Sequence, residues 1–338
     1  MKSKVVLLVA SIVFSTTAFA QKEELKTLKK IYAKEKKISD SDLELYKTTL
    51  AAAEPLIAVS NEDDKVYFAY YKGVLPVLEM TLALSNPAKN TDPLLSSKIL
   101  SVDKVKQYVA VTNATKEYEI KSGKQVYTKN IQESIASFKP MVINYAIALV
   151  NESKLKDAAL VLANIYELDK KDVEKLYFAA NYAVNSKDYV LALQYYQELK
   201  VLNYTGEATA YYAKNVVSDK EDYFGNTPEA KVDRETKIKL KLYSDLRDEK
   251  IPSKRPEIFK NIALIYVELG NSAEAKIAIQ EARKESPEDT SLILTESDLY
   301  LKANDMVNYK RLISEALEKN PSNADLVFNL GVITYNNK

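Results

Sequence analysis

The sequence predicts an all-α solenoid in which helical hairpins repeat along the chain, with one insertion of mixed helix and strand character. Two observations carry this prediction. Apolar residues recur every three or four positions through most of the 338 residues, which is the spacing of amphipathic helices. A step of 34 residues leads from Tyr266 to Tyr300, and the same step leads from Ala282 to Ala316. A lone helical pair cannot bury its apolar face, so such repeats are expected to stack.

The first twenty residues have the pattern of a secretory signal peptide. MKSK is a basic start, residues 5–14 form an apolar core, and Ala18 and Ala20 precede Gln21 in the A-x-A pattern. A membrane anchor is the alternative, but the apolar run is shorter than the ~18–20 residues that a spanning helix needs. We therefore expect residues 1–20 to be removed and the protein to be exported and soluble, either periplasmic or secreted.

Residues 21–138 are expected to form an N-terminal helical region of degenerate repeats. The apolar pattern from here onward predicts four helices, at 43–57, 65–84, 97–118 and 127–151. Gly73 stands in the small-residue place of the second helix. Acidic residues gather at Asp40–Asp42 and Glu62–Asp64 without the spacing of a calcium loop, so we assign them to helix starts, where carboxylates favour the helix dipole.

Clearer repeats follow in two sets. Two repeats occupy 139–206, and two repeats with a truncated third occupy 256–338. Ala192 and Ala275 are 83 positions apart, which is one step of 34 and a further 49 residues, so an insertion at 207–255 separates the sets. Small residues such as Ala275 let paired helices approach closely, while larger apolar residues fill the space beside them.

The last segment of the sequence, 324–338, should form a single helix. One of its faces, with Phe328, Val332 and Tyr335, has no following helix to cover it. Because an unstacked apolar repeat face is poorly soluble, we expect either a natural chain that continues past Lys338, or a partner or second copy on this face.

The repeats after the insertion resemble the tetratricopeptide repeat. The resemblance rests on Phe259-x2-Ile262-Ala263-x2-Tyr266, followed by Gly270, Ala275, Ala282 and Pro287. It implies right-handed stacking and a concave face, lined by the first helix of each pair, that holds a peptide or a partner protein. Glu296 and Tyr309 depart from the family, which prefers an apolar and a small residue there. Lys170 and Tyr204 replace its closing proline. The arrangement is also similar to exported repeat proteins of flavobacterial type.

The resemblance implies which first-helix residues face the concave groove. These predicted groove residues are Ile143, Ile147, Tyr177, Asn181, Val184, Lys260, Leu264, Leu294, Asp298, Phe328 and Tyr335. They are largely apolar with a few polar anchors, which suits an extended or helical protein segment. Alternatively, the N-terminal region or the insertion covers some of these positions.

The insertion differs from the repeats in its pattern. TAYYAKNVV and DYF alternate as short strands do, and Thr227-Pro228 starts a helix that we expect over 227–243. Arg234, Arg247 and Arg255 lie here, as do Tyr211, Tyr212, Tyr223 and Phe224. Two interpretations stay open: a projection that contacts a specific partner, or a local cover that seals the neighbouring repeats.

Composition excludes several chemistries. The chain has no histidine and no cysteine, which excludes an imidazole base, a thiol nucleophile, a disulfide and the usual zinc ligands. Neither G-x-G-x-x-G nor G-x4-G-K-[ST] occurs, so no phosphate-binding loop is expected. A formal net charge of +1 gives no electrostatic case for nucleic acid. We assign no catalytic, cofactor-binding or metal-binding residue.

The favoured function is an exported, non-catalytic scaffold of the bacterial cell envelope that binds a protein or peptide partner on its concave groove. Two alternatives remain open: a periplasmic protein that binds a glycan or peptide ligand, and an enzyme that uses carboxylates. Neither a nucleic acid partner nor a transmembrane segment is expected, and self-association through the open C-terminal helix is a further option.

Overall fold

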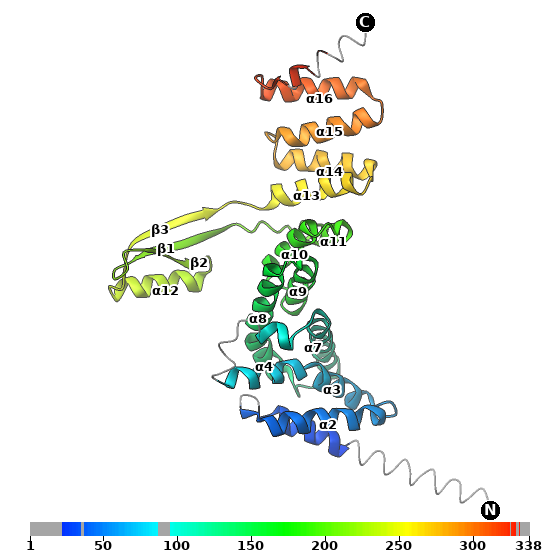
Figure 1. Cartoon of the computed structure of the whole chain (residues 1–338), viewed down its shortest axis with the longest axis vertical. Helices are drawn as coiled ribbons and strands as arrows, with labels where there is room; N and C mark the ends of the chain where they lie inside the picture. Colours follow the sequence, from blue (N-terminus) through cyan, green and yellow to red (C-terminus); the bar gives the residue numbers. More distant parts are fainter. Residues whose placement is uncertain (1–21, 35–36, 87–94, 325, 329–330, 332–338) are drawn as a thin grey trace, which may run out of the picture. The chain divides into compact units, whose positions relative to one another are not determined.

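The computed structural model of the chain describes residues 22–34, 37–86, 95–324, 326–328 and 331. Two compact units, Met1–Ser186 and Lys187–Lys338, make up the chain, and each is described by itself. Helices dominate both units, and a small three-stranded sheet lies in the second (Figure 1). The predicted fold class, all-α helical hairpins with a mixed insertion, is confirmed. The expected signal peptide and Tyr335 lie outside the described residues.

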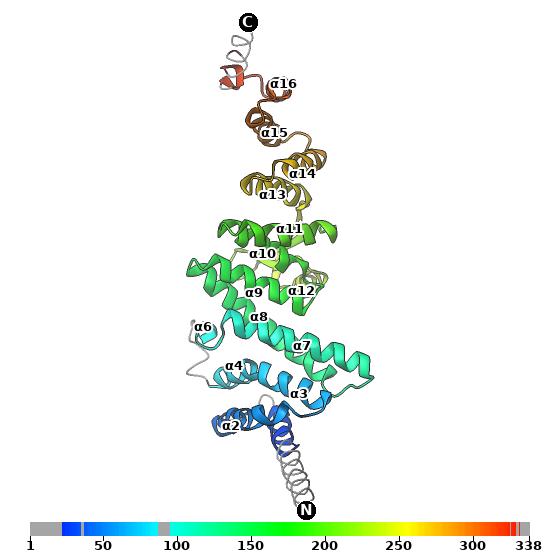
Figure 2. The same ribbon diagram turned by 90° about the vertical axis from the view of Figure 1, so that its right-hand side faces the viewer.

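Among its described residues, the first unit contains helices joined by turns and loops, and no strand (Figure 2). Its helices are residues 22–32, α2 (Asp40–Ile57), α3 (Glu62–Gly73), α4 (Leu75–Ser85), α6 (Leu95–Ile99), α7 (Val102–Ser122), α8 (Thr128–Asn151), α9 (Leu155–Leu168) and α10 (Val173–Asn185). Ser39 caps α2 by accepting a hydrogen bond from the Asp42 N–H, and Asn61 caps α3 through the Asp64 N–H. Both acidic clusters therefore occupy first helical turns, as predicted.

The single helix predicted over 65–84 is in fact two helices. The chain breaks at Val74, which ends α3 and precedes α4 (φ −84°, ψ −3°). Pro76 explains the break, because it has no N–H to donate to the carbonyl of Lys72 and its ring would collide with that carbonyl. The apolar spacing runs through the break unchanged, so the pattern alone predicted one helix.

A cluster of tyrosines fills part of the first unit's core. The ring of Tyr32 lies 5.7 Å from that of Tyr70 and 5.9 Å from that of Tyr127, with edges meeting faces. The hydroxyls of Tyr32 and Tyr70 share a hydrogen bond of 2.8 Å, and those of Tyr71 and Tyr127 share another. Burial raises the pKa of Tyr70 and of Tyr71 far above the usual value, so both phenols stay neutral.

The second unit stacks its helices across the insertion. They are α11 (Tyr189–Val201), α13 (Arg255–Glu268), α14 (Ser272–Glu285), α15 (Thr290–Lys302) and α16 (Met306–Lys319). α11 packs directly on α13: the Asn261 amide donates to the Tyr196 hydroxyl at 2.8 Å, and the Gln197 amide donates to the Tyr266 hydroxyl at 2.7 Å. The insertion therefore leaves this contact between repeat helices intact.

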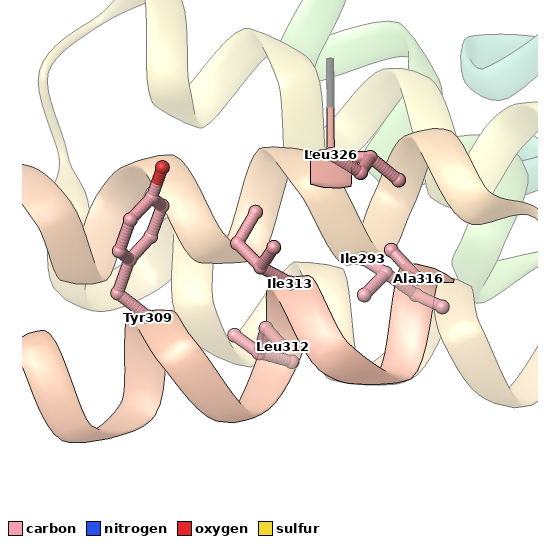
Figure 3. Close-up of a cluster of buried hydrophobic side chains, with 6 residues drawn as sticks. All are labelled: Ile293, Tyr309, Leu312, Ile313, Ala316 and Leu326. Carbon is pink, nitrogen blue, oxygen red and sulfur yellow. The ribbon is translucent and has the colours of Figure 1, made fainter. Parts of the chain in front are cut away.

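The residues that depart from the repeat pattern are accommodated by their neighbours. Glu296 is buried in α15, where its carboxylate pairs with the guanidinium of Arg283 from α14. A buried carboxylate is tolerated when it is paired in this way. Tyr309 belongs to a buried cluster formed by α15, α16 and Leu326 of the following segment (Figure 3), which comprises Ile293, Tyr309, Leu312, Ile313, Ala316 and Leu326.

The insertion forms a small arm, residues 207–253. It contains β1 (Ala208–Asn215), β2 (Glu221–Gly225), α12 (Pro228–Lys239) and β3 (Tyr243–Ile251). Both outer strands run antiparallel to the central β1, in the order β2-β1-β3, and α12 contacts all three strands. Figure 1 shows the sheet and α12 standing apart from α11 and α13. The mixed character was predicted, whereas β3 was not, and the helix ends at Lys239 rather than at residue 243.

No helix within the described residues combines the length and the apolar character needed to cross a lipid bilayer.

Candidate functional site

Two adjoining cavities lie between α4 and α8 in the first unit. The first has a volume of about 520 Å³ and the second of about 560 Å³. Both are lined by Leu84, Ser137 and Met141, so they form one groove, here called the α4–α8 groove. Its α8 wall extends from Asn130 to Asn151, which corresponds to about 30 Å of helix at the usual rise per residue.

The wall that α4 contributes is apolar. This helix has the sequence LPVLEMTLALS, in which Glu79 alone is charged. Val77 and Met80 are buried where they line the groove, while Thr81 and Leu84 are half-buried. A helix that is apolar on every side is normally covered on every side. Among the apolar residues of α4 that line the groove, Val77, Leu78 and Met80 are thus already covered, and Leu84 stays partly exposed.

The wall that α8 contributes is mixed. One row of its residues follows at spacings of three and four: Asn130, Ser134, Ser137, Met141, Asn144, Ala148 and Asn151. Pro140 and Ile147 also line the groove, so together with Met141 they add apolar side chains to this wall. Such spacing places side chains along one face of a helix. Small side chains allow another backbone to approach closely, and the amides supply hydrogen-bonding groups. The α8 wall of the groove is therefore partly polar and partly apolar.

The start of α8 is held in place by a buried carboxylate. Glu119, only 2% exposed, lies near the end of α7. One of its oxygens accepts a hydrogen bond from the Tyr127 N–H at 2.7 Å, and the other accepts bonds from the N–H and hydroxyl of Thr128. The carboxylate satisfies backbone donors that a helix leaves unpaired at its start, and its charge favours the helix dipole.

The middle of α8 is held by an ion-pair network. The Lys139 ammonium lies 2.8 Å from the Asp169 carboxylate and 2.7 Å from that of Asp172, at the turn between α9 and α10. Burial alone would lower the pKa of Lys139, but the two carboxylates outweigh burial and raise it. Hydrogen bonding to Lys139 lowers the pKa of Asp169. α8 is therefore anchored at its start and at its middle, which gives the groove a defined wall.

Predicted groove residues in the first unit fall into different environments. Ile147 lines the second cavity and is 53% exposed. Ile143, also on α8, is half-buried and does not line either cavity. On α10, Tyr177 is buried, and Asn181 and Val184 are half-buried. Of these five positions, the structure brings Ile147 alone to the α4–α8 groove.

Predicted groove residues in the second unit are partly engaged by neighbours. The Lys260 ammonium lies 2.7 Å from the Asp289 carboxylate and 2.8 Å from the Ser291 hydroxyl. Leu264 is half-buried, and Leu294 packs against the cluster shown in Figure 3. Asp298 is exposed, and Phe328 is 70% exposed. Their role in binding stays a prediction.

Sequence reasoning missed most of the residues that line the α4–α8 groove. The family geometry directed attention to the first helices of the clearer repeats, whereas α4 belongs to the degenerate region. Two signals were present in the sequence: the all-round apolar character of 75–85, and the alternating spacing of small and polar residues along 130–151. Neither signal says which elements face each other, because that depends on the packing of helices distant in sequence.

The arginines of the insertion make contacts within the second unit. Arg234 is 3% exposed and donates to the carbonyls of Tyr212 and Arg247 and to the Asp248 carboxylate. The guanidinium of Arg247 makes a bidentate pair with Glu221 and stacks on the Tyr212 ring at 3.9 Å. Arg255 pairs with Glu285. These arginines hold the arm and its base together.

Comparisons with known proteins locate the chain at the level of fold. No family model and no curated protein matches the sequence. Among solved structures, YrrB, described as a TPR protein with an unusual peptide-binding site, is 17% identical, with 63% of this chain and 84% of that chain covered and a TM-score of 0.36. PilF of Pseudomonas aeruginosa is 14% identical, with 70% and 89% covered and a TM-score of 0.34. MamA 41-end from Desulfovibrio magneticus RS-1 is 12% identical, with 64% and 97% covered and a TM-score of 0.34. Likenesses this remote carry no argument about binding.

The chain's own features define its class. Paired helices return at a spacing of 34 residues, and the alanines that the repeat pattern requires at positions 263, 275, 282 and 316 are fully buried. The protein therefore has a fold of stacked helical hairpins of the tetratricopeptide-repeat kind. The similarity to exported flavobacterial proteins stays a prediction.

Proposed function

We propose that the chain is an exported, non-catalytic scaffold of the bacterial cell envelope, and that it binds an amphipathic helix of a partner protein in the α4–α8 groove. The observation that carries the proposal is the long groove, in which Leu84 of α4 and Met141 and Ile147 of α8 supply apolar surface beside the small and polar residues of α8. An amphipathic helix presents one apolar and one polar face, which can meet these two kinds of side chain.

The dimensions of the groove support a helical occupant. A helix of about 20 residues is about 30 Å long, close to the length of the α8 wall. The spacing of three and four along α8 is also the spacing at which two helices interdigitate when they lie side by side. The small side chains of Ser137 and Ala148 leave room for a second helix to approach α8. The side-chain amides of Asn144 and Asn151 offer hydrogen bonds to the polar face of that helix.

The chemistry of the groove does not favour catalysis. Glu133 is the one acidic residue among the described residues that line it, and this carboxylate lies 3.7 Å from the Lys129 ammonium. Hydrolysis by paired carboxylates needs a second acid opposite the first. Export is supported by the basic start, the apolar run and the A-x-A pattern of residues 1–20.

Site-specific crosslinking tests the binding mode. A photoreactive amino acid at residue 84 should crosslink, in the native envelope, to one protein through a segment with helical apolar spacing. Leu84→Asp combined with Met141→Asp should abolish capture of that protein. A photoreactive residue at Ile120, an exposed aliphatic position outside the groove, is the matched control and should not crosslink to it.

Other outcomes would decide against the proposal. Capture that survives the two aspartates would remove the groove as the site. Saturable binding of a glycan that the same aspartates abolish, with no protein partner, would favour the ligand-binding alternative. A mature chain that begins at Met1 rather than at Gln21 would refute cleavage of the signal peptide.

A further inference from the structure

The far end of the arm is formed by two ordered turns that lie side by side. The Val216 N–H donates to the Leu242 carbonyl at 3.1 Å, which ties the turn between β1 and β2 to the turn between α12 and β3. The Asn215 side chain accepts hydrogen bonds from the N–H groups of Val217 and Ser218, at 3.0 and 3.1 Å. This arm tip, residues 215–220 and 239–245, therefore has a defined backbone.

Aliphatic side chains gather on the arm tip. Val216, Val217, Leu240 and Leu242 are each at least half exposed, and Val217 is 93% exposed. Single exposed aliphatic residues are ordinary on protein surfaces, but a group of them on adjoining turns indicates an interaction surface. None of the four is needed to cover the repeat helices, because the arm stands apart from α11 and α13 (Figure 1).

The charge that accompanies these side chains is mainly positive. Lys220, Lys239 and Lys241 are exposed, and they make no ion pair within the described part of the chain. Nearby carboxylates are mostly occupied: Asp219 lies 2.7 Å from the Lys214 ammonium, and Asp222 accepts a hydrogen bond from the Tyr243 hydroxyl. Asp245 adds one negative charge, so the lysines leave a positive surplus at the tip.

We propose that the arm tip is a membrane-contacting surface, which inserts its aliphatic side chains at the headgroup level of an anionic bilayer while its lysines bind the lipid headgroups. Apolar side chains flanked by lysines are the combination that binds such an interface. This proposal does not depend on the α4–α8 groove.

The shape of the tip favours lipid over a protein partner. Two tight turns that carry their side chains outward make a convex surface, which a soft headgroup layer can surround. β1 alone is about 26 Å long at the usual rise of a strand, so the tip can reach lipid while the base of the arm stays outside it.

A single fluorescent label tests the proposal on the full chain. Because the sequence contains no cysteine, Val217→Cys provides one attachment site for an environment-sensitive fluorophore, and Lys310→Cys on the exposed side of α16 provides the matched control. With vesicles of equal parts phosphatidylglycerol and phosphatidylcholine, the label at 217 should shift to shorter wavelength and brighten. The label at 310 should not respond, even if the apolar residues 5–14 bind the same vesicles.

Charge and composition variants complete the test. Replacing Lys220, Lys239 and Lys241 by glutamine should raise the lipid concentration needed for half of the response about 100-fold, since each lysine near an anionic surface contributes about 1 kcal/mol. Pure phosphatidylcholine vesicles should give little response. A label at 217 that ignores anionic vesicles, or an unchanged response in the glutamine variant, would overturn the proposal. A shift that appears without vesicles as protein concentration rises would show that a second copy covers the tip instead.

Discussion

Gly73 of α3 lies so close to Val111 of α7 that a Cβ atom on residue 73 would stand 2.2 Å from the Val111 Cγ2 atom. Real carbon atoms do not approach so closely, so in Gly73→Ala either the Val111 side chain or the two helices must shift. We expect the free energy of unfolding to fall by about 1–3 kcal/mol, measured by urea denaturation.

A second substitution tests the cause of that loss. Val111→Ala removes the opposing methyl groups, so the double variant Gly73→Ala with Val111→Ala should recover part of the stability lost in Gly73→Ala alone. If the two substitutions were simply additive, the contact between these residues would not be the source of the effect.

The buried carboxylate of Glu119 should be sensitive to an isosteric change. Both of its oxygens accept hydrogen bonds from donors at the start of α8, so the amide of Glu119→Gln would direct an N–H₂ group at a donor. We expect a loss of about 1–3 kcal/mol and faster hydrogen exchange in the first turn of α8. Glu117→Gln, at an exposed position beside Lys121, is the control and should change stability little.

The network around Lys139 predicts a specific dependence of stability on pH. The folded pKa of Asp169 lies below its ordinary value of 3.8, so its contribution is present above that pH and is lost as the pH falls through the folded pKa. The raised pKa of Lys139 adds stability below pH 10.5 that is lost only at higher pH. Lys139→Met should therefore destabilise the protein by about 1 kcal/mol at neutral pH, because the pair is partly exposed.

Acid titration of the same variant checks the sign. The difference in unfolding free energy between wild type and Lys139→Met should shrink as the pH is lowered below about 4, where the carboxylates become protonated in the unfolded chain. A difference that stays constant from pH 7 to pH 3 would contradict the assignment of Asp169 as the titrating partner.

The repeat phase predicts where a larger side chain is tolerated. Ala282 is fully buried in α14, whereas Gln280 is exposed on the same helix. Ala282→Leu should overpack the α13–α14 pair and cost about 1–3 kcal/mol, while Gln280→Leu should cost little. Equal denaturation midpoints for the two variants would show that Ala282 does not occupy the buried small-residue position of the repeat.

The parts of the fold that could be predicted are those fixed by local pattern. The alanines at 34-residue spacing located the helical hairpins, since a small residue is required wherever paired helices meet. The acidic clusters at Asp40–Asp42 and Glu62–Asp64 indicated the starts of α2 and α3, because carboxylates favour the first turn of a helix. Pro76 accounts for the break at Val74, but a proline alone does not predict a break in this chain, because Pro55 and Pro140 lie inside continuous helices.

The parts that could not be predicted depend on contacts between distant segments. β3 is an exposed edge strand with the sequence YSDLRDEKI. Charged residues on such an edge hinder its pairing with other chains. They also leave no alternation of apolar and polar residues from which a strand could be predicted. Its identity as a strand comes from pairing with β1. Likewise, the α4–α8 groove exists because two helices about fifty residues apart face each other across uncovered space.

Removal of the arm provides the final prediction. The Lys254 N–H donates to the Thr205 carbonyl at 2.6 Å, so the chain segments that enter and leave the arm already meet at its base. α11 and α13 also contact each other directly through Tyr196 and Asn261. Replacing residues 207–253 with a short Gly-Ser linker should therefore leave the repeat helices of the second unit folded, because loop closure at this point costs little.

Hydrogen exchange and calorimetry test whether the arm is an independent projection or a cover that stabilises the neighbouring repeat helices. In the excised chain, amide protection of α11, α13 and α14 should match that of the intact chain, and the melting temperature should change by no more than a few degrees. A labelled intact chain should keep its response to anionic vesicles, and a chain without the arm, labelled at the linker, should lose it. If α11 and α13 instead lose protection on excision, the arm is a structural cover of the neighbouring repeats, and its projection has no independent role.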